Sequence, residues 1–177
     1  MPVPYPLSDE VKVDMLRKLV LFWDGQWFLK AVDGFGLEAA IRLNAKVRTA
    51  FGRIEMRTLL HALRKRRADD LADAIRLLVT YGEVLMGGAL RADFQTVTPT
   101  LAEVLIYRCA AYAGAKMARL DRVDQACVAC ETLWDAWFEV LLPDTPVTVR
   151  YPMRQGKGDA HCHFIITLSS DPEGKPR

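Results

Sequence analysis

The chain has 177 residues, of which 51% are hydrophobic and 26% are charged, and its formal net charge is +2. This composition is ordinary for a folded globular protein with a sizeable core, and the weak net charge gives no reason to expect a nucleic-acid partner. The amino-terminal residues lack the features of a signal peptide, and no apolar run approaches the roughly 20 residues that cross a bilayer. We therefore expect a cytoplasmic protein with reduced cysteines, no nucleic-acid partner and no membrane partner.

The first 88 residues are predicted to be helical. Ser8 is a suitable N-cap for a helix that continues to about residue 32. A second helix starts near Leu37 and is expected to break near Gly52, because its apolar stripe rotates there. A third helix is predicted over residues 71–86, between two aspartates and a pair of glycines.

The first two helices each carry an apolar stripe at helical spacing, which we interpret as facing the core. The stripes are formed by Leu16, Leu19, Val20, Trp23 and Trp27, and by Ala40, Leu43, Val47, Phe51 and Ile54. Asp24 and Asn44 lie within these stripes, and the two helices are expected to be antiparallel neighbours. A carboxylate in such a place is either a structural polar link or an acid/base group with a raised pKa. Asp24 is therefore our first candidate catalytic residue.

The pattern changes from helical to alternating near residue 89. Residues 90–97 alternate between apolar and polar side chains, which is typical of a half-buried strand. Residues 98–108 fit two interpretations, because Thr100 and Glu103 form a capping box that would begin a helix, whereas the apolar run after them suits a buried strand. We favour a hairpin with its tip at residues 98–100 and keep the helix as the alternative.

The remainder mixes helices and strands. The elements expected there are a helix from about Cys109, a helix over 124–141, a strand over 147–151, a turn over 156–159, a strand over 161–168 and a polar tail over 169–177. This order predicts an α+β fold in which N-terminal helices pack on a small antiparallel sheet with one or two further helices. We expect one domain over residues 1–177, with a helical part at 1–88 and a strand–helix–strand part at 89–177. Because the small sheet has open edges, we also expect a homo-oligomer.

All four cysteines and two of the three histidines lie in the last third of the chain. In the run His161-Cys162-His163, the alternation of a strand places Cys162 on one face and both histidines on the other. Cys162 is either a small buried hydrophobe or a reactive thiol at the floor of a pocket. His161 and His163 are either surface residues or ligands of a metal ion.

Cys127 and Cys130 form a CxxC motif within a predicted helix. Such a motif could supply half of a zinc site, which another cysteine or one of the histidines would complete. The spacing matches no standard zinc module, and the alternative is that both cysteines are small apolar helix residues. Zinc is the one cofactor that the sequence suggests.

The aromatic residues have two interpretations. Trp23, Trp27, Trp134 and Trp137 suit a hydrophobic core, and they would also line a pocket if the helices pack over the sheet. We take Trp23, Trp27, Trp134 and Tyr107 as candidate ligand-binding residues.

The last third of the chain resembles the C-terminal region of the L-2-amino-thiazoline-4-carboxylic acid hydrolase family. The residues that carry this resemblance are Cys109, Cys127, Trp134, Pro143 and the run Gly158-Asp159-Ala160-His161-Cys162-His163-Phe164. The same pattern is more distantly similar to the 4-vinyl reductase domains that bind small molecules. The N-terminal segments at residues 24–28 and 35–39 resemble an uncharacterised bacterial family related to those hydrolases.

The resemblance implies a small-molecule ligand in an enclosed pocket, with hydrolase-like activity on a C–N or C–S bond. Asp24 would then act as general base or acid, Asn44 would orient substrate or water, and Cys162 would line the floor. Two other functions stay open: a non-enzymatic sensor or carrier, and a zinc-binding protein. His161 and His163 beside Cys162, together with Cys130, depart from the hydrolase pattern.

Overall fold

The computed structural model describes residues 5–168. Its first helices are α1 (Asp9–Phe35), α2 (Leu37–Ala62) and α3 (Leu71–Leu85), followed by the short 3-10 helix η1 (Gly87–Ala89). Strands β1 (Arg91–Val97) and β2 (Leu101–Arg108) come next, and then helices α4 (Ala110–Met117), α5 (Val123–Ala126) and α6 (Val128–Leu141). The last elements are β3 (Val147–Met153), the 3-10 helix η2 (Gln155–Lys157) and β4 (Cys162–Leu168). The predicted tail falls outside the described residues.

The strands form one four-stranded antiparallel sheet in the order β1-β2-β4-β3. Thr98 and Leu101 close the β1–β2 hairpin, because the Thr98 amide donates to the Leu101 carbonyl over 2.8 Å. The hairpin interpretation of residues 98–108 is therefore confirmed. In the β2–β4 register Val104 lies opposite Phe164 and Ile106 lies opposite Cys162, so Cys162 shares the core-facing side of the sheet.

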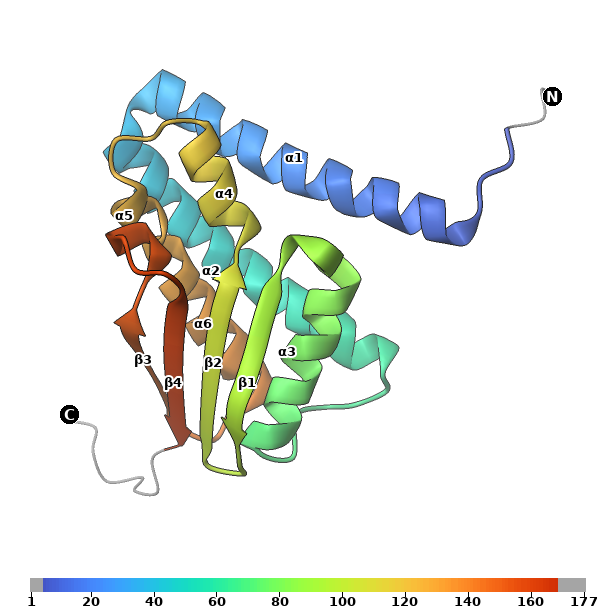
Figure 1. The fold of residues 1–177 in the computed structure, drawn as a ribbon. Helices are drawn as coiled ribbons and strands as arrows, with labels where there is room; N and C mark the ends of the chain where they lie inside the picture. The colour runs from blue at the N-terminus through green and yellow to red at the C-terminus, as the bar shows by residue number, and fades with distance from the viewer. Residues whose placement is uncertain (1–4, 169–177) are drawn as a thin grey trace.

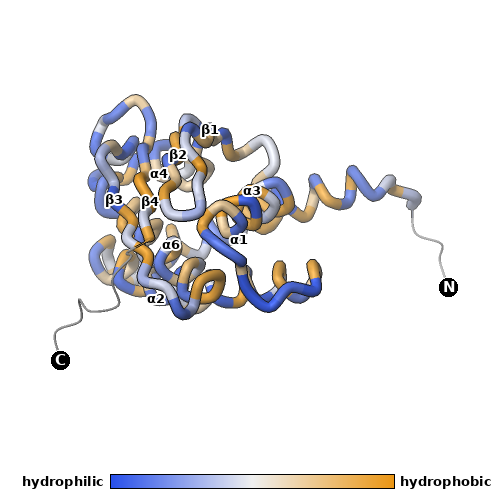
Figure 2. The backbone as a smooth tube through the Cα atoms, turned by 90° about the horizontal axis from the view of Figure 1, so that it is seen from below, coloured by the Kyte–Doolittle hydropathy of each residue, from blue (hydrophilic) through white to orange (hydrophobic). Residues whose placement is uncertain are grey.

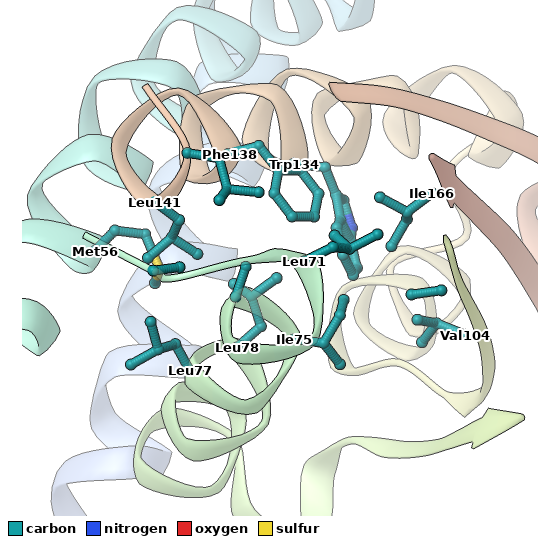
Figure 3. Close-up of a cluster of buried hydrophobic side chains, with 14 of the residues drawn as sticks. Met56, Leu71, Ile75, Leu77, Leu78, Val104, Trp134, Phe138, Leu141 and Ile166 are labelled. Atoms are coloured by element: carbon teal, nitrogen blue, oxygen red, sulfur yellow. The ribbon is translucent and has the colours of Figure 1, made fainter. Parts of the chain in front are cut away.

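Helix α6 lies between α2 and the sheet, and α3 lies beside β1 (Figure 1). One hydrophobic core joins these layers, and side chains from α3, α6 and the sheet converge in it (Figure 3). Its largest fully buried side chains are Met56, Leu71, Val104, Phe138, Leu141 and Ile166. The predicted α+β architecture is confirmed.

Helix α1 begins after the predicted N-cap and ends at Phe35, three residues beyond the predicted end. The Ser8 side chain caps its first turn, and Gly36 ends it with a φ of 80°, a conformation that favours glycine. Of its 27 residues, however, only Ala31 is buried. Arg17 holds the helix to the end of α3, where its side chain donates to the carbonyls of Glu83 and Val84 over 2.6 and 2.8 Å.

The prediction that the apolar stripes of the first two helices face the core is largely wrong. On α1, Leu16 is 61% exposed and Trp23 is 76% exposed, because the side that carries Arg17 and Asp24 faces the rest of the chain. On α2, Ala40 is buried, but Leu43, Val47, Phe51 and Ile54 are all 36% exposed or more.

Two predicted boundaries also differ. Helix α2 continues through Gly52 without a break, because the missing side chain there lets α6 approach closely. The helix expected over 124–141 is divided at Cys127, which ends α5 and begins α6. None of the helices among residues 5–168 is long and apolar enough to cross a bilayer.

Candidate functional site

The four cysteines gather at one end of the sheet, although they belong to different elements. Cys109 follows β2, Cys162 begins β4, Cys127 separates α5 from α6, and Cys130 lies in the first turn of α6. Cys109 lies near each of the other three cysteines. A thiolate at Cys109 would therefore raise the pKa of Cys127, Cys130 and Cys162. All four are partly buried and unpaired by disulfides. We call these four residues the thiol cluster.

Burial makes the thiols of this cluster weak acids. Removal from water raises the pKa of Cys127 to about 11, and the neighbouring Cys109 and Cys162 add to the effect. Burial likewise raises the pKa of Cys130 and of Cys162 above the ordinary value. Because the thiolate is the reactive form, this environment favours neutral thiols that line a site over a nucleophile.

Native Cys127 should therefore react slowly with iodoacetamide at neutral pH. A rise in pKa from 9.0 to about 11 lowers the thiolate fraction about a hundredfold, so the alkylation rate should fall by at least that factor. The rate should keep increasing with pH until about pH 11. Peptide mass spectrometry after timed labelling measures the alkylation rate of Cys127, and the urea-unfolded chain is the control. Equal rates in the folded and unfolded chain would contradict the prediction.

The loop before β4 packs directly on the thiol cluster. Gly156 of η2 approaches so closely that a Cβ built there would lie 2.8 Å from the Cys127 Sγ atom. Beside it, the buried Gln155 donates its backbone amide to the Cys162 Sγ atom over 3.3 Å and its side-chain amide to the Tyr107 carbonyl over 3.1 Å. These contacts fix the loop to the ends of β2 and β4.

Three buried polar atoms near the thiol cluster have no hydrogen-bond partner among the described residues. They are the Tyr151 hydroxyl, the Arg154 Nε atom and the Gln155 Oε1 atom. Arg154 lies over the Tyr151 ring, at 4.6 Å from the ring centroid, and forms an ion pair with Glu131. Because buried polar atoms are nearly always paired in folded proteins, an ordered water or a bound molecule would satisfy these three atoms. We call these three residues the unpaired polar group.

A loosely packed segment covers this end of the sheet. Residues 110–126 are all at least partly exposed, although helices α4 and α5 lie within that range. Helix α5 contacts η2, so the segment closes over the loop that carries Gly156. A segment with no buried side chains opens at low cost in free energy, and it can admit a molecule to the site beneath it.

The predicted metal ligands are only partly brought together. Cys127 and Cys130 belong to the thiol cluster, whereas the His161 ring lies 5.3 Å from the Tyr107 ring. His163 lies on the other face of the sheet, and its Nε2 atom is 3.3 Å from a Glu103 carboxylate oxygen. Within residues 5–168, no three His, Cys, Asp or Glu side chains are arranged to hold one ion. Zinc binding therefore stays a prediction, which elemental analysis of chelator-free protein would test.

Asp24 and Asn44 belong to the two neighbouring helices α1 and α2. Asp24 forms an ion pair with Arg48, which carries no distinguishing signal in the sequence. Asn44 is buried, and its Oδ1 atom has no partner in the described part of the chain. The next residue, Ala45, accepts a hydrogen bond from Thr132 of α6, two residues after Cys130. Neither Asp24 nor Asn44 is hydrogen-bonded to Cys162 among the described residues.

The four aromatic residues that were predicted to bind a ligand lie in different parts of the structure. Trp134 belongs to the core, where its ring packs edge-on against Phe164 with centroids 5.1 Å apart. Trp27 is half-buried against Phe28, whereas Trp23 is exposed. Tyr107 is partly exposed at the end of β2 beside the thiol cluster, and Trp134 also contacts this cluster through Cys130.

The sequence analysis overlooked a buried acid at the α2–α6 contact. Glu55 is 6% exposed and accepts a hydrogen bond of 2.7 Å from the Trp137 indole nitrogen. Tyr81 lies beside them, and its pKa is raised by burial and by the Glu55 charge. The position of Glu55 between Gly52 and Met56 on the inner side of α2 was the available signal. Because the carboxylate is paired, we interpret it as structural.

Two surface depressions lie elsewhere on the molecule. One of about 420 Å³ is lined by the basic side chains Arg57, Lys65 and Arg66, and another of about 290 Å³ lies beside Phe138 and Leu142. The space between the N-terminal helices and the sheet, where the sequence led us to expect a pocket, is occupied by α6.

Comparisons with known proteins bear on the fold. No family model and no curated protein matches the sequence, so the expected kinship with the hydrolases stays a prediction. Among solved structures, a trafficking protein particle complex subunit 3 from Naegleria fowleri, covalently bound to palmitic acid, aligns with a TM-score of 0.63 at 11% identity over 89% of this chain and 97% of that one.

The phenol-responsive sensory domain of the transcription activator PoxR, solved with phenol, aligns with a TM-score of 0.53 at 16% identity over 81% of this chain and 72% of that one. An H-NOX domain from Shewanella oneidensis in the Fe(II)CO ligation state aligns with a TM-score of 0.50 at 16% identity, over 84% of this chain and 76% of that one. The chain shares the α+β fold of these proteins.

Proposed function

We propose that this protein binds a small molecule with an apolar body and a hydrogen-bonding group. The ligand would lie under residues 110–126, against the thiol cluster and the unpaired polar group. The observation that carries the proposal is the set of three buried polar atoms without partners beside neutral thiols. A ligand hydroxyl or carbonyl there would satisfy atoms whose burial otherwise costs free energy.

The comparisons support ligand binding in general terms. The PoxR domain was solved with phenol and the trafficking subunit with covalently bound palmitic acid, so this fold accommodates an aromatic ring and an acyl chain. Both molecules combine an apolar body with one oxygen-bearing end. We use phenol and palmitic acid as probes for this reason.

A sensor or carrier fits the chemistry of the site better than a hydrolase. The raised pKa of Cys162 leaves little thiolate at neutral pH, and Asp24 is engaged by Arg48. The hydrolase hypothesis on a C–N or C–S bond therefore ranks second.

The substitution Tyr151→Phe tests the proposal. Without ligand, the free energy of unfolding should stay unchanged or rise by up to about 1 kcal/mol, because the substitution removes an unpaired buried hydroxyl. Affinity for the bound probe should fall about tenfold, which corresponds to one lost hydrogen bond. Isothermal titration calorimetry and urea unfolding measure the two quantities.

Tyr81→Phe is the matched control, because the Tyr81 hydroxyl lies beside Glu55 rather than unpaired. It should lower the free energy of unfolding by about 1 kcal/mol and leave probe affinity unchanged. The proposal fails if neither phenol nor palmitic acid binds saturably to the parent protein. It also fails if Tyr151→Phe weakens the fold while leaving probe affinity intact.

A further inference from the structure

The molecule exposes a large apolar surface on its first two helices. On α1 the exposed side chains are Leu16, Leu19, Val20 and Trp23, and on α2 they are Leu43, Val47, Phe51 and Ile54. Their exposed fractions range from 36% at Val47 to 76% at Trp23. We call these eight residues the apolar face. Figure 2 shows that α1 extends well beyond the rest of the chain, with hydrophobic residues along its free length.

The α1 residues and the α2 residues of the apolar face approach each other near one ion pair that joins the two helices. Asp24 of α1 contacts Arg48 of α2, and the two helices are antiparallel there. Val20 lies one turn before Asp24 and Phe51 lies about one turn after Arg48, so the two stripes approach each other at this point. The inner sides of both helices are already occupied, by Arg17 against α3 and by Gly52 against α6.

The size of this surface exceeds what a monomer usually exposes. The largest apolar patch on a typical monomeric protein covers about 300–600 Å² and is often functional. Eight large side chains that are roughly half exposed offer on the order of several hundred Å², comparable with the area of about 800 Å² that each partner buries in a stable interface. The face is therefore large enough for a stable dimer.

A second copy of the same chain fits this face. The exposed α1 residues run from Leu16 to Trp23, about 11 Å, and the exposed α2 residues run from Leu43 to Ile54, about 16 Å, at 1.5 Å per residue. Two copies related by a twofold axis could therefore each place the α1 part of the face on the longer α2 part of the other copy. The one charged residue within the stripes, Asp24, is already paired with Arg48, so no unpaired charge would be buried.

We propose that two copies of this chain associate through the apolar face, with α1 of each copy lying on α2 of its partner. This arrangement would cover exposed apolar side chains of a helix of 27 residues that has one buried residue. It also differs from the edge-to-edge association that the sheet suggested in the sequence analysis, because β1 and β3 take no part in it. The proposal is independent of ligand binding at the thiol cluster.

Light scattering coupled to size-exclusion chromatography tests the proposal on the full chain. The protein should elute with twice the chain mass of 19.9 kDa at micromolar concentration. The double variant Leu16→Glu/Trp23→Glu should elute as a monomer with unchanged circular dichroism, with self-association weakened at least about a hundredfold by the two buried charges. Met117→Glu is the matched control, because Met117 is 82% exposed on α4, outside the apolar face, and it should stay dimeric.

A photoreactive amino acid at position 23 locates the contact. Irradiation should give a product of dimer size, and its cross-linked peptide should come from residues 37–62. The proposal is overturned if the protein is monomeric at micromolar concentration or if the double variant stays dimeric. It is also overturned if the monomeric protein binds phosphatidylcholine vesicles through α1, because the face would then serve a lipid surface.

Discussion

Replacing Gly52 by valine should lower the free energy of unfolding by about 3 kcal/mol, because the new side chain would force α2 and α6 apart. A Cβ at this position would lie 2.9 Å from the Leu133 Cδ1 atom and 3.2 Å from the Ala136 Cβ atom. The Leu133 methyl group can rotate away, but the Ala136 Cβ is fixed to the backbone of α6. Urea unfolding followed by circular dichroism measures the loss, and Gly52→Ala should give a smaller loss of the same sign.

Gly25 provides the matched control. It also lies inside a long helix, but nothing lies within 4 Å of a Cβ built there. Gly25→Ala should therefore raise the free energy of unfolding by up to about 1 kcal/mol, as helix propensity alone dictates. If Gly52→Ala raised stability like Gly25→Ala, then the close approach of α2 and α6 at Gly52 would not exist in solution.

Gly52 also illustrates a limit of reading helices from sequence. The rotation of the apolar stripe near it suggested a break, whereas the helix is continuous and packs on α6 both before Gly52, where Thr132 donates to the Ala45 carbonyl, and after it, through Glu55. The apolar residues before Gly52, such as Phe51, are exposed, and those after it, such as Leu59, are buried. A stripe can thus rotate because exposed and buried apolar residues follow one another on one straight helix, and the sequence does not distinguish this from a kink.

Capping and turn residues predicted several other helix and hairpin boundaries well. Ser8 and Gly36 bound α1, Asp70 caps α3, and Thr98 closes the hairpin, as their side chains and backbone preferences dictate. These choices depend on a few neighbouring residues. The apolar stripes failed for the opposite reason, because periodicity shows that a helix side is apolar but not what covers it.

The candidate site was only partly accessible to sequence reasoning. The strand alternation correctly placed Cys162 on the core side and His163 on the other side of the sheet. The meeting of Cys162 with Cys127 and Cys130 depends on how α5, α6 and η2 fold over the sheet, which no spacing encodes. Tyr151 and Gln155 carried no motif at all, so their unpaired atoms could be found only from the structure.

Replacing Glu55 by alanine should lower the free energy of unfolding by about 3 kcal/mol, because it leaves a cavity and an unpaired indole N–H at the α2–α6 contact. The Trp137 nitrogen donates to this carboxylate over 2.7 Å in a place that water does not reach freely. Glu55→Gln should cost only about 1 kcal/mol, since the amide oxygen can still accept that hydrogen bond. Urea unfolding of the three proteins gives the comparison.

The pairing itself is measured by a double-mutant cycle with Trp137→Phe, which removes the indole donor. If the Glu55–Trp137 hydrogen bond contributes as its length and burial indicate, the two substitutions should be coupled by about 1–2 kcal/mol. Glu38→Ala is the control on the same helix, because the Glu38 side chain is 87% exposed and its loss should change stability by less than about 0.5 kcal/mol. A cost for Glu55→Ala as small as that of Glu38→Ala would mean that the carboxylate is not held against Trp137, and that α2 and α6 are joined by apolar contacts alone.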